Sequence, residues 1–461
     1  MSILIKNGCV ITTDGEISAD VFIENETIKR IEPNLDMKAD RIINAAGKLV
    51  IPGGIDVHTH LSLPLNNTMS SDNFETGTRA AAFGGTTTII DFAQQSKGHS
   101  LYEALDIRLR QAEKSVIDYG LHMIIVDLPK RRIVEINDMM KKGVTSFKLF
   151  TAYPDRLMVD DDTILRTLEQ TKNDGGLVCV HAEDSTLIDS LVKQALTDGK
   201  TAPKYHATTR PAGAEAKAVK HVIELAHQLN APVYFVHISC SDSLEYIRQA
   251  QSKGQSIYAE TCPQYLFTSI EDLDRPNFEG AKYVFTPPPR EKWNQEKLWE
   301  GLENNSLQVV STDHCPFNFR GDKELGRKDF TKIPNGAPGI ENRLQLLYYF
   351  GVESGKISIN QWVEIVSTTP AKLFGLYPKK GIIAIGSDAD IVIWNPKTEH
   401  TISASTHHMN VDYSLYEGWL IRGLAELVIS RGDIIIENGK WEGNSKRGKF
   451  CVRKIFQNSS S

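Results

Sequence analysis

Residues 49–60 read LVIPGGIDVHTH, an apolar run of strand character that ends in two histidines. Seven further runs of this kind follow along the chain, and helical stretches or long loops separate them. The eight runs lie at 49–57, 86–92, 120–126, 146–150, 177–181, 233–238, 256–260 and 307–312. Eight strands that each precede a helix or a long loop predict an α/β fold, the (β/α)8 or TIM barrel.

The segments between these runs place apolar residues at the 3.6-residue helical period. Such segments lie at 100–118, 160–173, 185–196, 215–229 and 241–253. A further helix is expected to begin near Asp72 and Asn73 and to include residues 78–83. Asp and Asn side chains favour the N-cap position of a helix. We therefore expect residues 51–379 to form the barrel domain.

The two ends of the chain have a different pattern. Residues 3–35 and the stretch after residue 381 read as short alternating strands separated by turn signals such as Asp14-Gly15 and Asn438-Gly439. Neither end has enough strands to bury a sheet face alone, so residues 1–50 and 380–461 are expected to pair into a small β-sandwich. The polar tail after about residue 443 is expected to be a mobile C-terminal arm.

Composition excludes several classes of protein. The chain has 461 residues, with 41% hydrophobic and 24% charged, as is usual for a globular protein. A net charge of −6 without a long basic run disfavours nucleic acid as a partner. No apolar stretch approaches the roughly 20 residues that span a bilayer, and the start is not of the signal-peptide type. Six scattered cysteines without a CxxC pair are typical of reduced thiols, which predicts a cytoplasmic protein.

His58 and His60 follow the first run with one residue between them. Residues i and i+2 of a strand point to the same side, so both imidazoles can point toward the C-terminal mouth of the barrel. Two converging neutral imidazoles form half of a zinc-type site. An isolated HxH pair is more often two loop histidines, but the position at a barrel strand end favours the metal site.

Four other strand ends carry residues that could join the same site. These are Lys148 in the fourth run, His181 at the end of the fifth, His237 near the end of the sixth and Asp313 after the eighth. Taken singly, each has an ordinary alternative: a histidine there is usually a satisfied core or rim residue, and Asp313 could cap a helix. Because catalytic residues of such barrels come from several strand ends, five strand ends with potential ligands favour one shared site.

Lys148 stands in an apolar strand, SFKLF at 146–150. Burial there disfavours the charged ammonium, so the pKa of the amine should fall. A neutral amine can add CO2 to give a carbamate, whose two oxygens could bridge two metal ions. The alternatives are an ion pair with a buried carboxylate or a Schiff base, and the surrounding histidines favour the carbamate over the Schiff base.

Segments along essentially the whole chain resemble the cyclic amidohydrolases of the amidohydrolase superfamily, specifically the dihydropyrimidinases and D-hydantoinases. The segments are PGGIDVHTHL (52–61), GGTTTIIDFA (84–93), SFKLFTAY (146–153), VHAED (180–184), VHIS (236–239), ETCPQYL (260–266), STDHCPF (311–317), FTKIPNGAPGIENR (330–343) and HHMNVDYSLYEG (407–418). The resemblance implies a dinuclear zinc hydrolase that opens 5,6-dihydrouracil or dihydrothymine to N-carbamoyl-β-amino acids in pyrimidine catabolism.

The resemblance also implies roles for the candidate ligands. His58 and His60 are expected to bind the more buried of two Zn2+ ions, and His181 and His237 the other. Lys148, carboxylated on its side-chain nitrogen by CO2, would bridge both ions. Asp313 would complete the first metal site and act as the catalytic proton shuttle.

Further residues are implied to contact the substrate. The hydroxyl of Tyr153 is expected to stabilise the oxyanion, whereas its alternative role is a rim aromatic. Backbone groups at Thr286 and Asn335 are expected to hold the ring amide. Thr286 departs from the serine that is usual in the family, and a backbone contact should tolerate this change.

Specificity is expected to depend on the cavity mouth. Leu65, Phe150 and Leu157 resemble the gate residues of the family, which contact the exocyclic group of the substrate. Their alternative role is core packing. Dihydroorotase-like sequences carry arginine, and allantoinase-like sequences usually asparagine, where this chain has Ser62, so an uncharged cyclic diamide is favoured. Segment 407–413 resembles the corresponding segment of dihydropyrimidinases more than that of bacterial hydantoinases. An equally good interpretation is a structural loop that joins the sandwich to the barrel.

Two alternatives stay open. The chain could be a D-hydantoinase or allantoinase-type enzyme, because hydantoinases and dihydropyrimidinases overlap in substrates. It could also be a non-catalytic scaffold relative, although such relatives lose metal ligands and all six ligand positions are intact here. The resemblance implies a homotetramer, with a dimer as the alternative.

Overall fold

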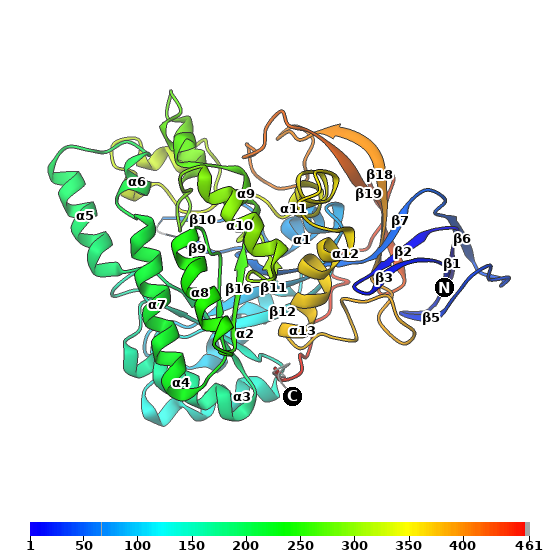
Figure 1. Cartoon of the computed structure of the whole chain (residues 1–461), viewed down its shortest axis with the longest axis horizontal. Coiled ribbons are helices and arrows are strands. Elements are labelled where there is room, and N and C mark those ends of the chain that lie inside the picture. Colours follow the sequence, from blue (N-terminus) through cyan, green and yellow to red (C-terminus); the bar gives the residue numbers. More distant parts are fainter. Residues whose placement is uncertain (66, 457–461) are drawn as a thin grey trace.

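The computed structural model describes residues 1–65 and 67–456 and shows a barrel beside a smaller β-rich unit (Figure 1). Among these residues, eight parallel strands form one sheet in chain order. They are β8 (Gly54–Thr59), β11 (Thr86–Gln94), β12 (Asp118–Ile124), β13 (Ser146–Phe150), β14 (Leu177–His181), β15 (Val233–Phe235), β16 (Ile257–Thr261) and β17 (Val309–Val310). A parallel bridge between Thr59 and His314 brings the first and last strands together, so the predicted barrel is confirmed.

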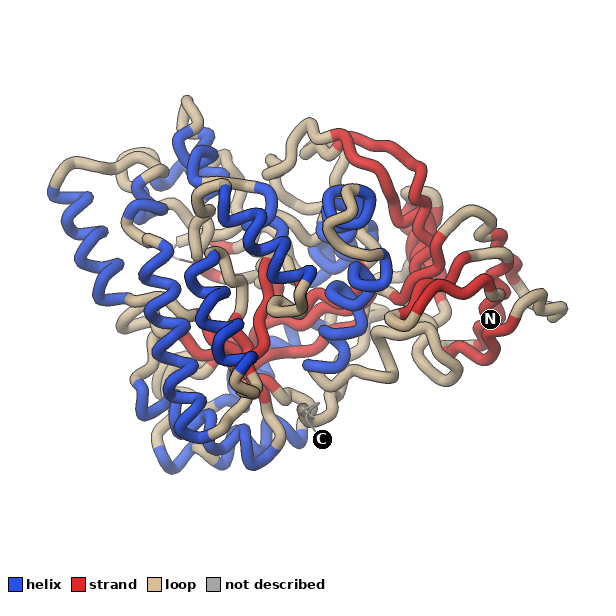
Figure 2. Tube along the Cα trace, in the orientation of Figure 1, coloured by secondary structure: helices blue, strands red, loops and turns tan. Residues whose placement is uncertain are grey.

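Helices surround this sheet, as Figure 2 shows. The longer ones are α1 (Phe74–Phe83), α2 (Leu101–Ala112), α3 (Val134–Lys141), α4 (Asp161–Asp174), α5 (Ser185–Thr197), α7 (Ala212–Leu229), α8 (Ser241–Ser252) and α10 (Trp293–Glu303). Shorter helices are α6 (Tyr205–Thr208), α9 (Pro263–Phe267), α11 (Arg343–Leu347), α12 (Ile359–Val363) and α13 (Thr369–Leu373). Asn73 caps α1 as predicted, since its side chain accepts from the backbone N–H of Glu75 and Thr76. The predicted helix 100–118 ends earlier, because Asp118 already begins β12.

Both ends of the chain build the β-rich unit. One sheet has the order β5-β4-β1-β6 and the other the order β21-β20-β19-β18-β7-β2-β3. Their strands are β1 (Ser2–Lys6), β2 (Cys9–Thr12), β3 (Gly15–Ser18), β4 (Asp20–Glu24), β5 (Thr27–Glu32), β6 (Arg41–Asn44), β7 (Leu49–Pro52), β18 (Ile391–Thr401), β19 (Leu420–Ser430), β20 (Asp433–Glu437) and β21 (Lys440–Trp441). Ile3, Val21, Val50, Ile391 and Ile429 share one buried apolar cluster across these sheets, as a sandwich requires.

The predicted run 49–57 is two strands rather than one. β7 pairs with β2 and β18 in the sandwich, whereas β8 pairs with β11 in the barrel. The run looked continuous because both halves are buried and apolar. Gly53 and Gly54 mark the crossing, and a Cβ on Gly53 would lie only 2.1 Å from Thr87 Oγ1. A side chain at this position would therefore push the chain away from the barrel.

The expectation of a mobile C-terminal arm is wrong for the residues that the structure describes. Cys451 N–H donates to Tyr119 O at 2.7 Å and Phe456 N–H to Gly175 O at 2.7 Å, at the N-terminal ends of barrel strands. Arg453 is buried and donates to Ser146 Oγ at 2.9 Å. The described C-terminal residues up to Phe456 therefore lie beneath the barrel rather than in the sandwich (Figure 1). Residues 457–461 of the predicted arm lie outside the described residues.

Lys380 joins the sandwich to the barrel. Its ammonium lies 2.8 Å from Asp118, 3.0 Å from Asp388 and 2.6 Å from Asp390, and its side chain is 2% exposed. Paired in this way, a buried ammonium keeps its charge, and the charges of these aspartates raise its pKa well above the usual value even though burial opposes this. Lys380 is thus a structural lysine at the base of the barrel.

The described part of the chain contains no helix that combines the length and the apolar character required to cross a bilayer.

Candidate active site

A cavity of about 260 Å³ opens at the C-terminal ends of the barrel strands. Every residue that the sequence predicts for the site lines this cavity. They are His58, His60, Leu65, Lys148, Phe150, Tyr153, Leu157, His181, His237, Thr286, Asp313 and Asn335. Strand ends that are far apart in sequence thus meet at one place, which is where barrel enzymes carry their chemistry.

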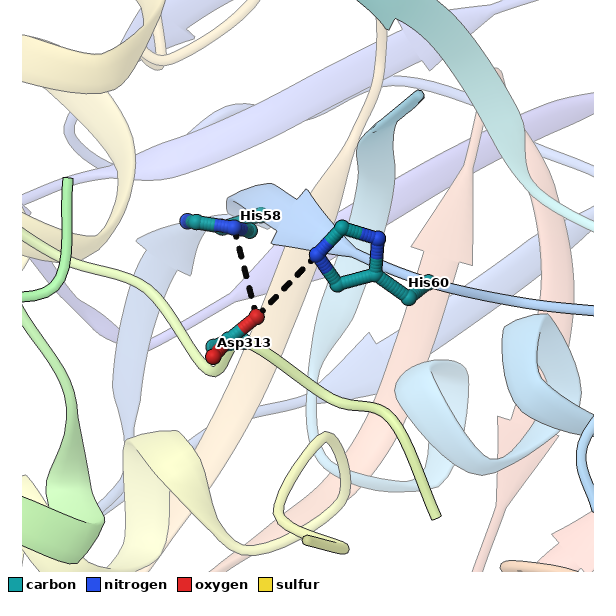
Figure 3. A group of neighbouring side chains, drawn as sticks. All are labelled: His58, His60 and Asp313. Carbon is teal, nitrogen blue, oxygen red and sulfur yellow. Dashed lines mark ion pairs between the residues drawn. The ribbon is translucent and has the colours of Figure 1, made fainter. Parts of the chain in front are cut away.

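His58, His60 and Asp313 form the tightest group of potential metal ligands among the described residues. The Nε2 atoms of His58 and His60 each lie 3.2 Å from Asp313 Oδ1. Figure 3 shows the carboxylate of Asp313 between the two rings, with both histidines coming from the end of β8. The ligand atoms all lie within 4.8 Å of one another, so one cation could contact all three.

His181 and His237 form a second pair beside the first. His181 Nδ1 lies 2.9 Å from His237 Nε2, and the two ring centroids are 4.7 Å apart. The ring of His237 also stacks on that of His58 at 5.4 Å. Four imidazoles therefore line the cavity together. His58 lies in β8 and His60 directly follows it, His181 ends β14, and His237 comes two residues after β15.

Buried carboxylates hold the far nitrogens of these rings. His58 Nδ1 lies 2.5 Å from Glu260 Oε1, and His181 Nε2 lies 2.9 Å from Glu183 Oε2. Burial opposes ionisation of Glu183, yet the hydrogen bond from His181 and the charge of Arg210 lower its pKa to about 2. Metal-binding histidines usually donate their other N–H to such a carboxylate, so the arrangement fits a metal site. Neither glutamate was predicted for the site, although Glu183 lies in the segment VHAED (180–184) and Glu260 in ETCPQYL (260–266), both of which resemble the family.

Lys148 lines the same cavity as the two histidine pairs and is almost fully buried. Its Nζ lies 5.4 Å from the ring centroid of Phe92 and 5.2 Å from that of Phe150. Burial lowers the pKa of Lys148 to about 8, and burial also holds the pKa of His58 and His237 well below their usual values. Neutral imidazoles and a readily neutralised amine are the forms that bind metals and add CO2.

Three residues that line this cavity, and Ser62 close to His60 in the chain, have positive φ although they are not glycine. The φ angles are 40° at His237, 48° at Asp313, 66° at Tyr153 and 50° at Ser62. Such left-handed backbone costs free energy for these residue types and persists only where the surrounding structure imposes it. Its concentration here indicates that the fold holds the side chains in directions that an unconstrained chain would avoid.

Tyr153 and Thr286 face the cavity from loops. The ring of Tyr153 lies 5.3 Å from that of His181, and burial raises the pKa of its hydroxyl to about 12. The hydroxyl therefore keeps its proton at neutral pH and can donate a hydrogen bond. Behind it, His206 Nε2 lies 2.9 Å from Phe285 O and 3.3 Å from Thr286 Oγ1, which anchors the loop that carries Thr286.

Two arginines that sequence reasoning missed also line the cavity. Arg156 is exposed at the mouth, and Arg210 lies deeper, with its guanidinium carbon 5.8 Å from the ring of Tyr153. Arg210 also lies 3.8 Å from Glu183. Neither belongs to a recognisable motif, so only the folded chain reveals them.

Segment 407–413 does not line the cavity. The ring of His408 stacks on Phe83 with centroids 3.3 Å apart, and Asn410 N–H donates to Asp72 Oδ1 at 3.0 Å. These contacts tie the β18–β19 connection to helix α1 and to Asp72, the residue before its N-cap. They favour the structural interpretation of this segment over a role in substrate choice.

Comparison with known proteins agrees with this geometry. A family model described as "Amidohydrolase family" matches residues 49–421. The chain belongs to this family. It is 50% identical over 460 residues to a D-hydantoinase of Streptomyces coelicolor, covering 98% of both chains. It is 48% identical over 458 residues to a D-hydantoinase of Rhizobium radiobacter, covering 99% of this chain and 100% of the relative.

Solved structures of amidohydrolases superpose on the whole chain. A crystal structure of dihydropyrimidinase from Brevibacillus agri gives a TM-score of 0.98 at 49% identity and covers 99% of this chain and 100% of its own. A structure of L-hydantoinase (dihydropyrimidinase) from Arthrobacter aurescens gives a TM-score of 0.88 at 30% identity, covering 97% and 99%. The resemblance found in the sequence is confirmed, and with it the barrel and sandwich architecture.

Proposed function

We propose that this chain is a dihydropyrimidinase, a hydrolase that opens the cyclic amide of 5,6-dihydrouracil or dihydrothymine to an N-carbamoyl-β-amino acid. The observation that carries the proposal is the convergence of four histidines, Lys148 and Asp313 on one cavity of about 260 Å³. Relatives that align over the whole length and are named D-hydantoinase or dihydropyrimidinase support the same reaction class.

The donor set fits two Zn2+ ions per chain. His58, His60 and Asp313 would hold one ion, and His181 and His237 the other. Lys148, as the N6-carboxylated form made with CO2, would bridge the two. Bound zinc would polarise the ring carbonyl and would make hydroxide available at neutral pH.

The residues of the chain then direct the reaction. The carboxylate of Asp313 accepts the proton that the attacking water loses and passes it to the ring nitrogen as the C–N bond breaks. The hydroxyl of Tyr153 donates a hydrogen bond to the carbonyl oxygen as negative charge develops there. Backbone groups at Thr286 and Asn335 hold the ring amide, so that the carbonyl faces the metal site.

The mouth of the cavity limits the size of the ring substituent. Leu65, Phe150 and Leu157 line the cavity with apolar side chains. Ser62, two residues after His60 in the chain, carries no charge. A slim, uncharged ring such as dihydrouracil fits these surroundings. We propose that these gate residues determine which exocyclic groups are accepted.

Substituting Tyr153 with phenylalanine is expected to lower kcat by about 10²- to 10³-fold, the usual cost of one lost oxyanion donor. Zinc content should stay at the wild-type level, because the hydroxyl is not a proposed ligand. Steady-state kinetics with dihydrouracil and metal analysis of the same preparation check both points. Wild-type kcat in this variant would rule out the proposed donor.

Ring opening of dihydrouracil, hydantoin, allantoin and dihydroorotate should be compared after reconstitution with zinc and bicarbonate. The highest kcat/KM is expected for dihydrouracil. A clear preference for another ring would leave the proposed chemistry of the site unchanged. It would mean that Ser62 and the gate residues select a different substrate from the one proposed. Failure to open any of the four, with two metals bound, would contradict the proposed substrate class.

A hydantoinase is the second candidate, favoured by the names of relatives at 48–50% identity. An allantoinase-type enzyme has less support because Ser62 occupies the diagnostic position. A non-catalytic scaffold is disfavoured, since all six ligand positions meet in one cavity. Protein that binds no zinc after reconstitution would revive the scaffold interpretation.

We also propose a cytoplasmic homotetramer. The six cysteines are free thiols, as a reducing compartment would leave them. The tetramer, with a dimer as the alternative, follows from the resemblance to the family. Light scattering after size exclusion distinguishes the two assemblies.

A further inference from the structure

Lys323 is a fully buried lysine outside the group of candidate metal ligands. It begins the short helical turn η4 (Lys323–Gly326), and its side chain is 0% exposed. Its Nζ lies 2.8 Å from Val284 O, 2.7 Å from Pro334 O and 2.7 Å from Gly336 O. An ammonium has three N–H donors, so each donor of Lys323 meets one backbone carbonyl.

The three acceptors belong to two loops that reach the cavity. Val284 precedes Thr286 by two residues, while Pro334 and Gly336 flank Asn335. Thr286, Asn335 and Gly336 line the cavity, and Lys323 does not. The ammonium therefore contacts both loops from behind, on the side away from the substrate.

A direct backbone hydrogen bond joins the same two loops. Gly336 N–H donates to Val284 O at 3.1 Å, so Val284 O accepts from both Gly336 and Lys323. Gly336 has a φ of 146°, and a Cβ there would lie 2.2 Å from Cys315 O. This close packing leaves the loop little freedom to shift while the hydrogen bonds are made.

We propose that Lys323 is a positioning residue for substrate binding, which sets the spacing between the backbone groups at Thr286 and Asn335. The inference rests on the proposed function, in which those two groups hold the ring amide. Without the ammonium, three buried carbonyls would lose a donor, and the loops would move apart or take up water. The ring would then be held less well both before and during the reaction.

The cost of burying this charge supports a specific role. Burial lowers the pKa of Lys323 to about 7, and only weaker interactions with Cys315 and Asp322 oppose this shift. No carboxylate pairs with the ammonium within the described residues, in contrast to Lys380 and its aspartates. Burying a charged group without a carboxylate partner costs free energy. Its position at two cavity loops therefore indicates a specific role rather than core packing alone.

A matched pair of variants separates positioning from general stability. Lys323→Met and Lys380→Met each remove one buried ammonium and leave a side chain of similar length. Lys380 lies between the sandwich and the base of the barrel, away from the cavity. Both variants are expected to melt at a lower temperature than the wild type, and only Lys323→Met is expected to affect substrate binding.

Kinetics of the zinc-reconstituted full chain with dihydrouracil provide the test. Lys323→Met should raise KM by about tenfold or more with kcat within about threefold of wild type, because the lost interaction acts equally on ground and transition states. Zinc content should not change. Lys380→Met should keep the wild-type KM. An unchanged KM in Lys323→Met, or an equal rise in Lys380→Met, would overturn the inference.

Hydrogen exchange keeps the inference testable apart from the activity. The amides of Thr286 and Gly336 should exchange faster in Lys323→Met than in the wild type, while those of β8 should not change. If the wild type opens no ring, the proposed function fails, yet this measurement still tests whether Lys323 holds the loops. Equal exchange at both amides would overturn the inference.

Lys323→Arg serves if the methionine variant does not fold. Its planar guanidinium keeps the charge but cannot present three donors in the directions of an ammonium. KM should therefore rise with unchanged zinc content. A wild-type KM in this folded variant would show that the geometry of the ammonium is not required, and would overturn the inference.

Discussion

Replacing Asp313 with alanine is expected to reduce turnover of dihydrouracil by about 10³-fold or more, near the upper range for the loss of a general acid and base. Asp313 Oδ1 lies 3.2 Å from the Nε2 atoms of both His58 and His60, so its carboxylate is central to the first proposed metal site. Removing it takes away one ligand and the proton carrier together. Part of the zinc should remain, because the histidines and Lys148 are unchanged.

Asp313→Asn is the matched variant for this experiment. It keeps the size of the side chain and one oxygen able to contact metal, but an amide cannot accept and return the proton. It should therefore retain more zinc than Asp313→Ala while losing a similar share of kcat. Metal analysis, melting temperature and kcat are measured on the same preparations. Near-wild-type activity in either variant would refute the role assigned to Asp313.

Lys148→Ala is expected to lose one of the two zinc ions and nearly all activity. The side chain lines the same cavity as the histidine pairs, and burial lowers its pKa to about 8, which makes the neutral amine accessible for reaction with CO2. Short carboxylates such as acetate or propionate should partly restore both zinc content and turnover, because they can occupy the space and supply two oxygens. Metal per chain and initial rates, measured with and without added carboxylate, check the expectation.

Lys148→Met is the control for this rescue. Methionine fills most of the space that alanine leaves open, so added carboxylate should find no room and restore nothing. Two fully occupied metal sites in Lys148→Ala would contradict the proposed bridge. Equal rescue of both variants would show that the carboxylate acts elsewhere than at position 148.

Much of the fold could be predicted because its signals are local. The strands 146–150 and 177–181 coincide with β13 and β14, and the helix expected at 241–253 coincides with α8 to within one residue. Apolar periodicity, caps and turn residues act over a few neighbours, so they are legible in one sequence. The strand-end position of His58, Lys148 and Asp313 then predicted a shared site, because parallel strands of a barrel end at one mouth.

Other features depended on contacts between distant segments. The run 49–57 proved to be two strands in two sheets, since apolar residues look alike whether they pack in the sandwich or the barrel. The C-terminal residues looked like a free arm, yet Arg453 and Phe456 pack against the ends of barrel strands.

The site itself divides in the same way. The sequence by itself determined the barrel and the strand-end ligand candidates, because these follow from local pattern and residue type. The family and the further residues that line the cavity followed from the resemblance of its motifs. The tertiary structure alone decided that Glu260 and Glu183 orient the histidines and that Lys323 holds two cavity loops. These roles arise from partners that are far apart in the chain, and only folding brings their donors and acceptors within hydrogen-bond distance.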